Sequence, residues 1–373
     1  MKSAATASVS LSDVQSCPPP TDFNAPEALE TLFAKAESSN ASDIHLQMLP
    51  SEAQIMFRLD GVLAACHRIP REPAERLFGR IKFLAKLKTY QESIPQDGRI
   101  EKGDVGSQAD IRVATYPTVT GEKIVLRLFS ATKMLLLEEL GFDLNTLQEL
   151  SAFLRQTSGL LLLTGPAGSG KTATIYACLR ELARMGGRHI ITVEDPAEQI
   201  IPGVMQTEVN EARGLDFAKA ARHLLRQDPQ VLVLGEIRDD ETAAIAVRAA
   251  LTGHLVISTL HAGSCAGVFE RLFAFCPDAS AIGSAAQLIL NQRLVRKVCP
   301  SCHGSRCEEC LHTGYRGRIP LAEHLSITPQ QRKRIAVRDW DSFDVHPNLL
   351  ECAAKLVEEG VTDRAEINRV LGF

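Results

Sequence analysis

The sequence predicts an α/β protein with two domains, a small mixed domain followed by a larger one built on a parallel sheet. Between residues 22 and 130, segments with helical spacing of apolar residues alternate with segments of strand-like alternation. Between residues 142 and 373, short apolar runs are separated by helical segments, which indicates a parallel sheet with helices on both faces. One of these runs, Leu160–Leu163, leads directly into a glycine-rich loop. A chain of 373 residues is long enough for both domains.

Composition and charge narrow the class of protein. The apolar fraction of 45% is ordinary for a globular protein, and the net charge of −4 gives no global basic field for nucleic acid or acidic lipid. The first residues lack the apolar core of a signal peptide, and no apolar run reaches about 18 residues. Ten cysteines in such a chain favour thiols or a metal site over disulfides. We therefore expect a cytoplasmic protein that associates with membranes only through partners.

The N-terminal part begins with a Ser/Ala/Thr-rich segment, residues 1–21, which offers little to bury and is expected to be a disordered tail. Residues 22–130 form the small α/β domain, and residues 131–141 form a linker. The elements expected in this domain are helices at Glu27–Glu37 and Glu72–Lys88 and strands at 42–46, 54–59, 62–69, 109–115 and 123–129.

In the larger domain, residues 142–373, a helix at Phe142–Thr157 precedes four apolar strands. Ligands of parallel sheets bind at the carboxyl ends of the strands, so the residues that follow each strand are candidates for chemistry. The later part holds a cysteine-rich element at 299–318 and a helical part at 326–373. After the strand at Leu160–Leu163, the expected strands are His189–Val193 before Glu194, Val231–Leu234 before Glu236, and Leu255–Leu260 before His261.

The glycine-rich loop has the spacing of a phosphate-binding loop, G-x-x-x-x-G-K-T, between a strand and a helix. Its glycines allow backbone N–H groups to surround phosphates, while Lys171 reaches the terminal phosphates and the Thr172 hydroxyl holds Mg²⁺. The chain is therefore expected to bind a nucleoside triphosphate. The residues expected to bind it are Gly165, Gly168, Ser169, Gly170, Lys171, Thr172 and Thr174.

Two glutamates are candidates for the hydrolysis of the terminal phosphate, which needs a held Mg²⁺, a positioned water and positive countercharge. Glu236 ends its strand and suits either metal binding or water polarisation; the alternative is a structural ion pair with Arg238. Glu194 is the second candidate and is favoured as the general base, although the residues alone do not divide the two roles. His261 is placed to sense the terminal phosphate, although a single histidine beside apolar strand residues is often only a core residue.

Paired C-x-x-C units, separated by only four residues, precede a glycine-rich stretch. Four thiolates satisfy a tetrahedral Zn²⁺ ion and tie down a short segment that lacks a core of its own. Free or redox-active thiols are the alternative, and four cysteines argue against catalytic zinc because they leave no open position. The expected zinc ligands are Cys299, Cys302, Cys307 and Cys310.

Five ordered blocks resemble the secretion-ATPase superfamily, the motors of type II secretion and type IV pilus assembly. They are ASDIHLQ with FRLDG, QDGRI with IRVATYPTVTGEKIVLRL, GPAGSGKT with ITVEDPAE, RQDPQVLVLGEIRDDETA, and TGHLVISTLHAG. The resemblance implies a PAS-like N-terminal domain and a RecA-like P-loop NTPase domain with a tetracysteine zinc element and C-terminal helices. It also implies that His254 joins His261 in a nucleotide-binding His box. Arg112 and Arg127 then match arginines that reach a nucleotide across a domain or subunit boundary, and Arg99 is a weaker candidate.

The family's working form implies a homohexameric, Mg²⁺-dependent ATPase that drives assembly of pilin-like subunits. Its implied partners are an inner-membrane platform protein and associated membrane-anchored components, with no direct nucleic acid. The cysteine pairs favour assembly over retraction, although their spacing is shorter than in the family. The alternatives are a retraction motor, a nucleic-acid or conjugative translocase on the same core, and an ATP-binding scaffold that does not hydrolyse. The acidic balance and the aromatic fraction of 5% argue against a translocase.

Overall fold

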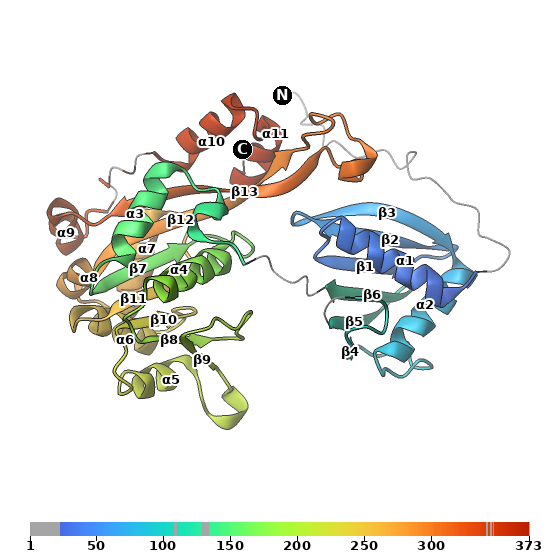
Figure 1. Ribbon diagram of the computed structural model, residues 1–373, viewed down its shortest axis with the longest axis horizontal. Coiled ribbons are helices and arrows are strands. Elements are labelled where there is room, and N and C mark those ends of the chain that lie inside the picture. Colours follow the sequence, from blue (N-terminus) through green and yellow to red (C-terminus); the bar gives the residue numbers. More distant parts are fainter. Residues whose placement is uncertain are drawn as a thin grey trace. The chain divides into compact units, whose positions relative to one another are not determined.

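The computed structural model describes residues 23–107, 110–128, 134–340, 342–343, 345 and 347–372. The expected disordered tail, residues 1–21, and residues 131–133 of the expected linker lie outside the described residues. The described chain divides into two compact units that are coloured along the sequence in Figure 1. The first unit comprises residues 23–128 and Val298–Gly317, and the second comprises residues 134–297 and 318–372.

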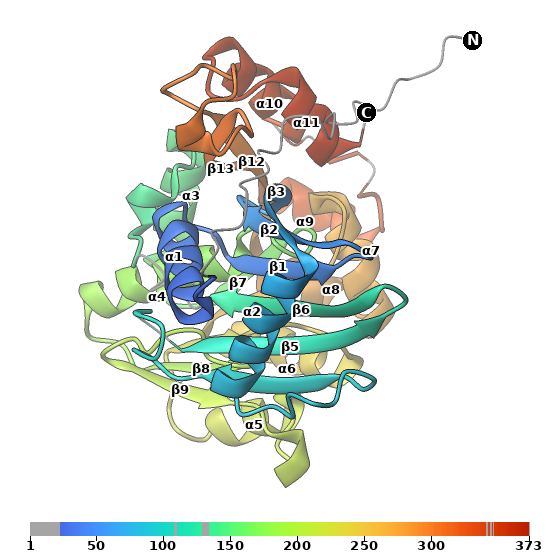
Figure 2. The same ribbon diagram turned by 90° about the vertical axis from the view of Figure 1, so that its right-hand side faces the viewer.

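The first unit is a two-layer α/β structure in which both helices cover the same face of a six-stranded sheet (Figure 2). The sheet order is β3-β2-β1-β6-β5-β4. Alternating side chains such as Ile55 and Phe57 of β2 point into the core, where they meet Leu29 and Phe33 of α1. The elements are α1 (Ala25–Ser38), β1 (Asp43–Met48), β2 (Glu52–Leu59), β3 (Val62–Pro70), α2 (Arg71–Leu84), β4 (Gln96–Ile100), β5 (Ile111–Thr118) and β6 (Gly121–Leu128).

Two features of this unit differ from the sequence-based expectation. The second helix, expected at Glu72–Lys88, ends at Leu84, because Lys86 takes a left-handed backbone conformation with φ of 60° and the Leu87 amide turns back to the Lys82 carbonyl at 2.9 Å. Strand β4 was not expected, since its sequence QDGRI carries a glycine and two charges. It forms the edge of the sheet, where such a sequence is tolerated.

The second unit is a three-layer structure around a seven-stranded sheet with the order β13-β12-β7-β11-β10-β8-β9. Helices α3 and α4 pack on one face and α5 to α9 on the other, which confirms the predicted doubly covered sheet. Every pair of neighbouring strands from β12 to β9 is parallel. The elements up to β11 are η2 (Leu137–Leu140), α3 (Leu144–Leu154), β7 (Gly159–Thr164), α4 (Lys171–Met185), β8 (Ile190–Glu194), β9 (Val204–Glu208), η3 (Glu211–Arg213), α5 (Phe217–Leu224), β10 (Val231–Leu234), α6 (Asp240–Leu251) and β11 (Leu255–Leu260).

The C-terminal half of the second unit is built on two long strands that were not predicted. They continue the sheet beyond β7, and the two last helices pack on them around Val295 and Leu321. Over the residues that the structure describes, no helix has both the length and the apolar character needed to cross a bilayer. The elements are α7 (Cys265–Phe275), α8 (Ala279–Ala285), β12 (Ala286–Val298), η4 (Glu308–Cys310), β13 (Tyr315–Ser326), α9 (Pro329–Ala336), α10 (Leu349–Glu358) and α11 (Arg364–Leu371).

The cysteine-rich segment between β12 and β13 groups with the first unit, although the sequence-based division places residues 299–318 in the second domain. Two contacts account for this grouping. The Gly317 amide donates to Oδ2 of Asp60, in the turn between β2 and β3, at 2.7 Å. Leu311 packs against the apolar core of the first unit. The segment thus leaves the second unit along one strand and returns along the next.

A buried carboxylate fastens α11 to β12. The side chain of Glu366 is fully buried, and its oxygens accept hydrogen bonds from Arg296 at 2.6 and 2.9 Å and from Arg369 at 2.6 and 2.8 Å. The Arg296 amide adds a bond of 3.0 Å. Burial alone would raise the pKa of Glu366, but the hydrogen bonds from Arg369 and Arg296 lower it to about 2. The C-terminal helix therefore depends on an ionised carboxylate.

We expect Glu366→Gln to lower the free energy of unfolding by about 3 kcal/mol, because it removes the buried negative charge that Arg296 and Arg369 share. Since the pKa is lowered in the folded state, this stabilisation is complete above the unfolded pKa of about 4.3 and disappears as the pH falls toward 2. Urea unfolding between pH 3 and 7 measures both effects. The control is Glu358→Gln, exposed on α10, which should change stability by less than about 0.5 kcal/mol. Equal effects of the two substitutions would contradict the assignment.

Candidate functional site

The glycine-rich loop lies between β7 and α4, and neighbouring backbone decides which residues fit in it. Gly165 has φ of 137°, and a Cβ there would lie 2.3 Å from the Gln292 carbonyl oxygen of β12. Gly170, at φ of 91°, caps α4, and its Cβ would meet the Gln292 amide at 3.0 Å. The loop therefore needs glycine at both positions for conformation and for space. The loop is followed directly by the N-terminus of a 15-residue helix, and the free backbone N–H groups there favour binding of an anion.

Lys171 folds back over the loop. Its Nζ donates to the carbonyl oxygens of Gly165 at 2.8 Å and Pro166 at 3.0 Å. Burial lowers the pKa of Lys171 and the charge of Arg293 adds to this, while the carboxylate of Glu236 acts in the opposite direction. Thr172 is exposed at the next position of α4. An ammonium group and a hydroxyl group thus stand at the start of the helix, as the phosphate-loop motif requires.

The side chain of Gln292, in β12, forms hydrogen bonds to the phosphate loop and to the helix that follows it. Its Nε2 donates to the Ser169 carbonyl oxygen at 2.7 Å, and its Oε1 accepts from the Thr174 hydroxyl at 3.0 Å. These residues are almost fully buried. Sequence reasoning missed Gln292 because β12 itself was not predicted. The available signal was a polar triplet, Asn291–Arg293, directly after an apolar run in a strand-like segment.

Glu236, Arg238 and His261 meet at the carboxyl ends of β10 and β11. Oε1 of Glu236 lies 3.0 Å from Nε2 of His261, and Oε2 accepts from Nε of Arg238 at 2.8 Å. The hydrogen bond to Glu236 raises the pKa of Arg238. Arg238 also reaches Asp195 at 3.5 Å. The predicted grouping of Glu236 with His261 is therefore present, beside the ion pair that the sequence offered as the alternative.

Glu194, at the end of β8, lies in a closed hydrogen-bond network. Its oxygens accept from the hydroxyls of Tyr176 and Thr192 and, at 2.9 Å, from the amide of Gln206. The Tyr176 oxygen in turn accepts from the Glu198 amide at 2.8 Å. Burial, followed by the interaction with Glu194, raises the pKa of Tyr176 to about 12. Tyr176 was not singled out in the sequence, where it reads as one more apolar residue of the helix.

His254 lies at the opposite end of β11 from the loop. Strands β7 and β11 are in parallel register, with Leu255 beside Gly159 and Leu260 beside Thr164. The Nδ1 of His254 lies 3.0 Å from the Ala249 carbonyl oxygen instead. The structure thus brings His261 to the phosphate loop of its own chain but not His254. Its nucleotide-binding role remains a prediction from the resemblance.

The candidate arginines lie in one row across the first unit's sheet. Register pairs Arg99 with Arg112, and Arg112 with Arg127. Arg127 in turn pairs with Asp43, whose other neighbour is Arg58. Directly opposed side chains share a face, and like charges in such positions destabilise a sheet. Arg99, Arg112 and Arg127 therefore place like charges beside one another, a cost that an anionic ligand would offset, whereas Arg58 faces the carboxylate of Asp43.

Asp43 supplies buried negative charge within this row. Its carboxylate accepts from Nε of Arg127 at 3.1 Å and pairs with Nε of Arg58 at 3.2 Å. Burial alone would raise the pKa of Asp43, but hydrogen bonds from Ser42 and Arg127 and the charges of Arg127 and Arg58 lower it. Arg99 pairs with Asp110. Arg112 and Arg127 are both exposed on this face.

The four predicted metal ligands come together in the segment between β12 and β13. Their sulfur atoms all lie within 4.8 Å of one another, with separations of 3.9 Å for Cys299–Cys307 and Cys302–Cys310 and 3.8 Å for Cys307–Cys310. Four sulfurs bound at about 2.3 Å to a tetrahedral zinc ion lie about 3.8 Å apart. The donor set and its spacing therefore fit a structural zinc ion.

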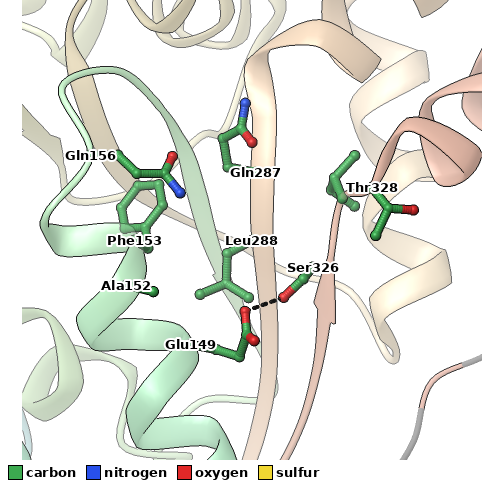
Figure 3. A pocket seen from close by; sticks show the side chains of 9 residues that line it. Glu149, Ala152, Phe153, Gln156, Gln287, Leu288, Ser326 and Thr328 are labelled. Atoms are coloured by element: carbon green, nitrogen blue, oxygen red, sulfur yellow. Dashed lines mark hydrogen bonds between the residues drawn. The ribbon is translucent and has the colours of Figure 1, made fainter.

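A cavity of about 190 Å³ between α3 and strands β12 and β13 lies away from these groups (Figure 3). Its Gln287 side chain approaches Gly159, at the amino end of β7, whereas the phosphate loop follows the carboxyl end. The carboxylate of Glu149 accepts from the Ser326 hydroxyl, and Gln287 accepts from Arg332 at 3.2 Å. These polar groups are already paired within the protein, so we assign no ligand to the cavity.

Comparisons with known proteins place these features in a family. Residues 23–369 match the family model described as Type II/IV secretion system protein. The chain is 41% identical over 350 residues to the protein transport protein HofB homolog of Haemophilus influenzae, covering 92% of this chain and 72% of that protein. It is 39% identical over 374 residues to type II secretion system protein E of Aeromonas hydrophila, with coverage of 92% and 74%.

Two solved structures share the fold. The Legionella pneumophila ATPase DotB superposes with a TM-score of 0.70 at 24% identity, over 94% of this chain and 97% of that one. The pilus retraction motor PilT with bound ADP superposes with a TM-score of 0.62 at 25% identity, over 90% and 95%.

Proposed function

The chain belongs to the type II/IV secretion system protein family and is a secretion ATPase. We propose that it hydrolyses ATP at the loop between β7 and α4 and that this hydrolysis powers the assembly of pilin-like subunits. The observation that carries this proposal is the meeting of phosphate-loop, acid and histidine groups at one edge of the parallel sheet. Lys171 follows β7, Glu236 follows β10 and His261 follows β11, and these three strands are neighbours. This is the edge at which parallel sheets bind ligands.

In the proposed reaction, the loop's N–H groups and Lys171 bind the β- and γ-phosphates. On binding, Lys171 exchanges the carbonyls of Gly165 and Pro166 for charged phosphate oxygens, which are stronger acceptors. The Thr172 hydroxyl and a carboxylate form the hard oxygen donor set that Mg²⁺ prefers. Mg²⁺ bound with the nucleotide would neutralise charge on the phosphates.

We assign the orientation of the attacking water to Glu236. The water oxygen bonds to the γ-phosphorus, the bond from that phosphorus to the bridging oxygen breaks, and ADP leaves with the bridging oxygen. The water's proton passes to the Glu236 carboxylate. The sequence favoured Glu194 for this role, but Glu194 is buried among its donors. Glu236, whose oxygens pair with Arg238 and His261, is more exposed and close enough to Lys171 to influence its pKa. Glu194 then shapes the site through Tyr176.

Arg112 and Arg127 are proposed to supply countercharge to a nucleotide across a subunit boundary in a homohexamer. Their support is their position on neighbouring strands, where Arg112 lies between Arg99 and Arg127 and like charges face one another. The proposed place of action is the cytoplasmic face of the inner membrane, through a platform protein and membrane-anchored components. The tetracysteine cluster favours assembly over retraction by resemblance to assembly motors.

Glu236→Gln is expected to lower kcat by about 10²–10³-fold while changing the affinity for ADP less than about threefold, because an amide cannot accept the water's proton. Glu194→Gln is expected to lower the free energy of unfolding by about 2 kcal/mol, because the NH₂ group of the new amide would face the hydroxyl and amide donors that now bond to the Glu194 carboxylate. Steady-state hydrolysis, ADP titration and urea unfolding measure these effects, with Glu241→Gln on the surface of α6 as the control. Retained kcat in Glu236→Gln, with an inactive but stable Glu194→Gln, would return the base role to Glu194.

Hydrolysis per subunit is expected to rise with protein concentration as rings assemble, and Lys171→Ala is expected to abolish it. A minor fraction of Arg112→Ala added to the unsubstituted protein should reduce activity by more than its share, because one defective subunit affects its neighbour's site. A coupled phosphate-release assay over a concentration series measures this. Activity that is independent of concentration, together with purely additive mixing, would argue against arginines acting across subunits.

Purified protein is expected to contain one zinc ion per chain, and Cys302→Ser is expected to lower the content and the thermal midpoint of unfolding together, since metal binding is coupled to folding of its segment. Elemental analysis and differential scanning calorimetry provide the two readouts. Cys276→Ser, a half-buried thiol outside the cluster, serves as the control. Zinc-free protein whose midpoint is insensitive to chelators would support the free-thiol alternative.

A further inference from the structure

Arg293 of β12 joins the phosphate loop to the segment that follows His261. Its Nη2 donates to the Gly263 carbonyl oxygen at 3.0 Å, and its Nη1 donates to the Gln292 carbonyl oxygen at 3.0 Å. The same Nη1 lies 3.1 Å from the position that a Cβ on Gly165 would occupy. The guanidinium group is therefore at the first glycine of the phosphate loop and in contact with the chain two residues beyond the histidine.

The charge environment of Arg293 is unusual for a structural arginine. Among the residues that the structure describes, its hydrogen bonds go only to neutral oxygens, those of Asn291, Gln292 and Gly263. It is half-buried and close enough to Lys171 to lower that residue's pKa. The carboxylates of Glu236 and Glu323 partly offset the charges of Lys171 and Arg293, but among the described residues neither cation donates a hydrogen bond to a carboxylate. This arrangement points to a ligand with several negative charges.

Buried polar groups hold Arg293 in this place. The Asn291 side chain accepts from Nη1 of Arg293 at 2.7 Å and donates to Glu323 at 2.8 Å. Glu323 is buried, and its second oxygen accepts from the Leu349 amide at the N-terminus of α10 at 3.2 Å. A carboxylate at a helix N-terminus is favourably placed, so this support is stable without a ligand. Asn291 thus fixes the guanidinium on the side of the loop.

We propose that Arg293 is a further ligand of the γ-phosphate, supplied by the same chain as the phosphate loop, and that Asn291 positions it. The inference rests on the proposed binding of ATP at this loop. When the triphosphate binds, Arg293 exchanges a neutral acceptor for a phosphate oxygen and forms a stronger, charge-assisted bond. The Gly263 carbonyl is released at the same time, so the segment after His261 differs between the ATP and ADP states. Arg293 distinguishes ATP from ADP, because ADP lacks the group that it contacts.

The test compares Arg293→Gln, Arg293→Lys and Asn291→Ala in the full chain, with Lys297→Gln, exposed four residues further along β12, as the matched control. Calorimetric titrations measure the affinities for ADP and for a non-hydrolysable ATP analogue with Mg²⁺, and steady-state assays give kcat and KM. We expect Arg293→Gln to lose about 10²-fold in kcat and at least about tenfold in analogue affinity, with ADP affinity within about threefold. Arg293→Lys should recover part of both losses. Asn291→Ala should shift kcat more than KM, and Lys297→Gln should change neither.

Equal losses of analogue and ADP affinity in Arg293→Gln would assign Arg293 a structural role in the loop and overturn the proposal. Unchanged kcat and unchanged affinities in a folded variant would overturn it as well, and a thermal melt of each variant identifies a folding defect. If Arg293→Gln fails to fold, Arg293→Lys decides: analogue affinity equal to that of the unsubstituted protein, with unchanged kcat, overturns the proposal. Lys171→Ala tests the proposed ATP site separately from the role of Arg293. If this variant still binds nucleotide, the proposed site itself is contradicted, and not only the role of Arg293.

Discussion

The contact between strand β12 and the phosphate loop is the constraint on which the site depends. The Gln292 carbonyl oxygen occupies the space that any side chain at residue 165 would need, and the Gln292 side chain holds the loop's far end through Ser169 and Thr174. The loop is therefore shaped by a strand more than a hundred residues later in the chain, in addition to its own glycines. Because β12 pairs with β7, this shape exists only when the sheet is complete. The site and the fold of the second unit are consequently formed together.

Cationic side chains lie close to one another in both units. The second unit places Lys171 and Arg293 beside the loop and sets Glu236 against Arg238 and His261. The first unit opposes like charges across neighbouring strands, with Asp43 as the buried counterion for two of its arginines. Lys171 with Arg293, and the opposed arginines of the first unit, place like charges together, which opposes stability in the free protein, and bound phosphate groups would offset this repulsion. Sites that break local rules in this way are typically functional.

The sequence was most informative where chemistry and secondary structure coincide. The strand, loop and helix around Lys171 and the ends of β8, β10 and β11 could be predicted, because buried parallel strands are continuous apolar runs that end at polar residues. Strands β4, β12 and β13 could not, since their charged and polar residues resemble loops until their neighbours in the sheet are known. Gln292 and Arg293 were missed because the strand that carries them, β12, was not predicted. Tyr176 was missed because its role depends on a carboxylate that tertiary packing brings to it. His254 was joined to His261 by resemblance, although a strand separates them.

The cysteine segment changes how the two units are connected. Because Val298–Gly317 belongs with the first unit while β12 and β13 belong chiefly to the second, the backbone crosses between the units three times rather than once. Two of these crossings are continuous with long strands of the second unit's sheet. The N-terminal unit is therefore not an appended module that can be excised by cutting before residue 134. Removing it would take away the apolar core against which Leu311 packs and the Asp60 carboxylate that accepts the hydrogen bond of the Gly317 amide. Separating either unit from the other would therefore require cutting the chain at three places.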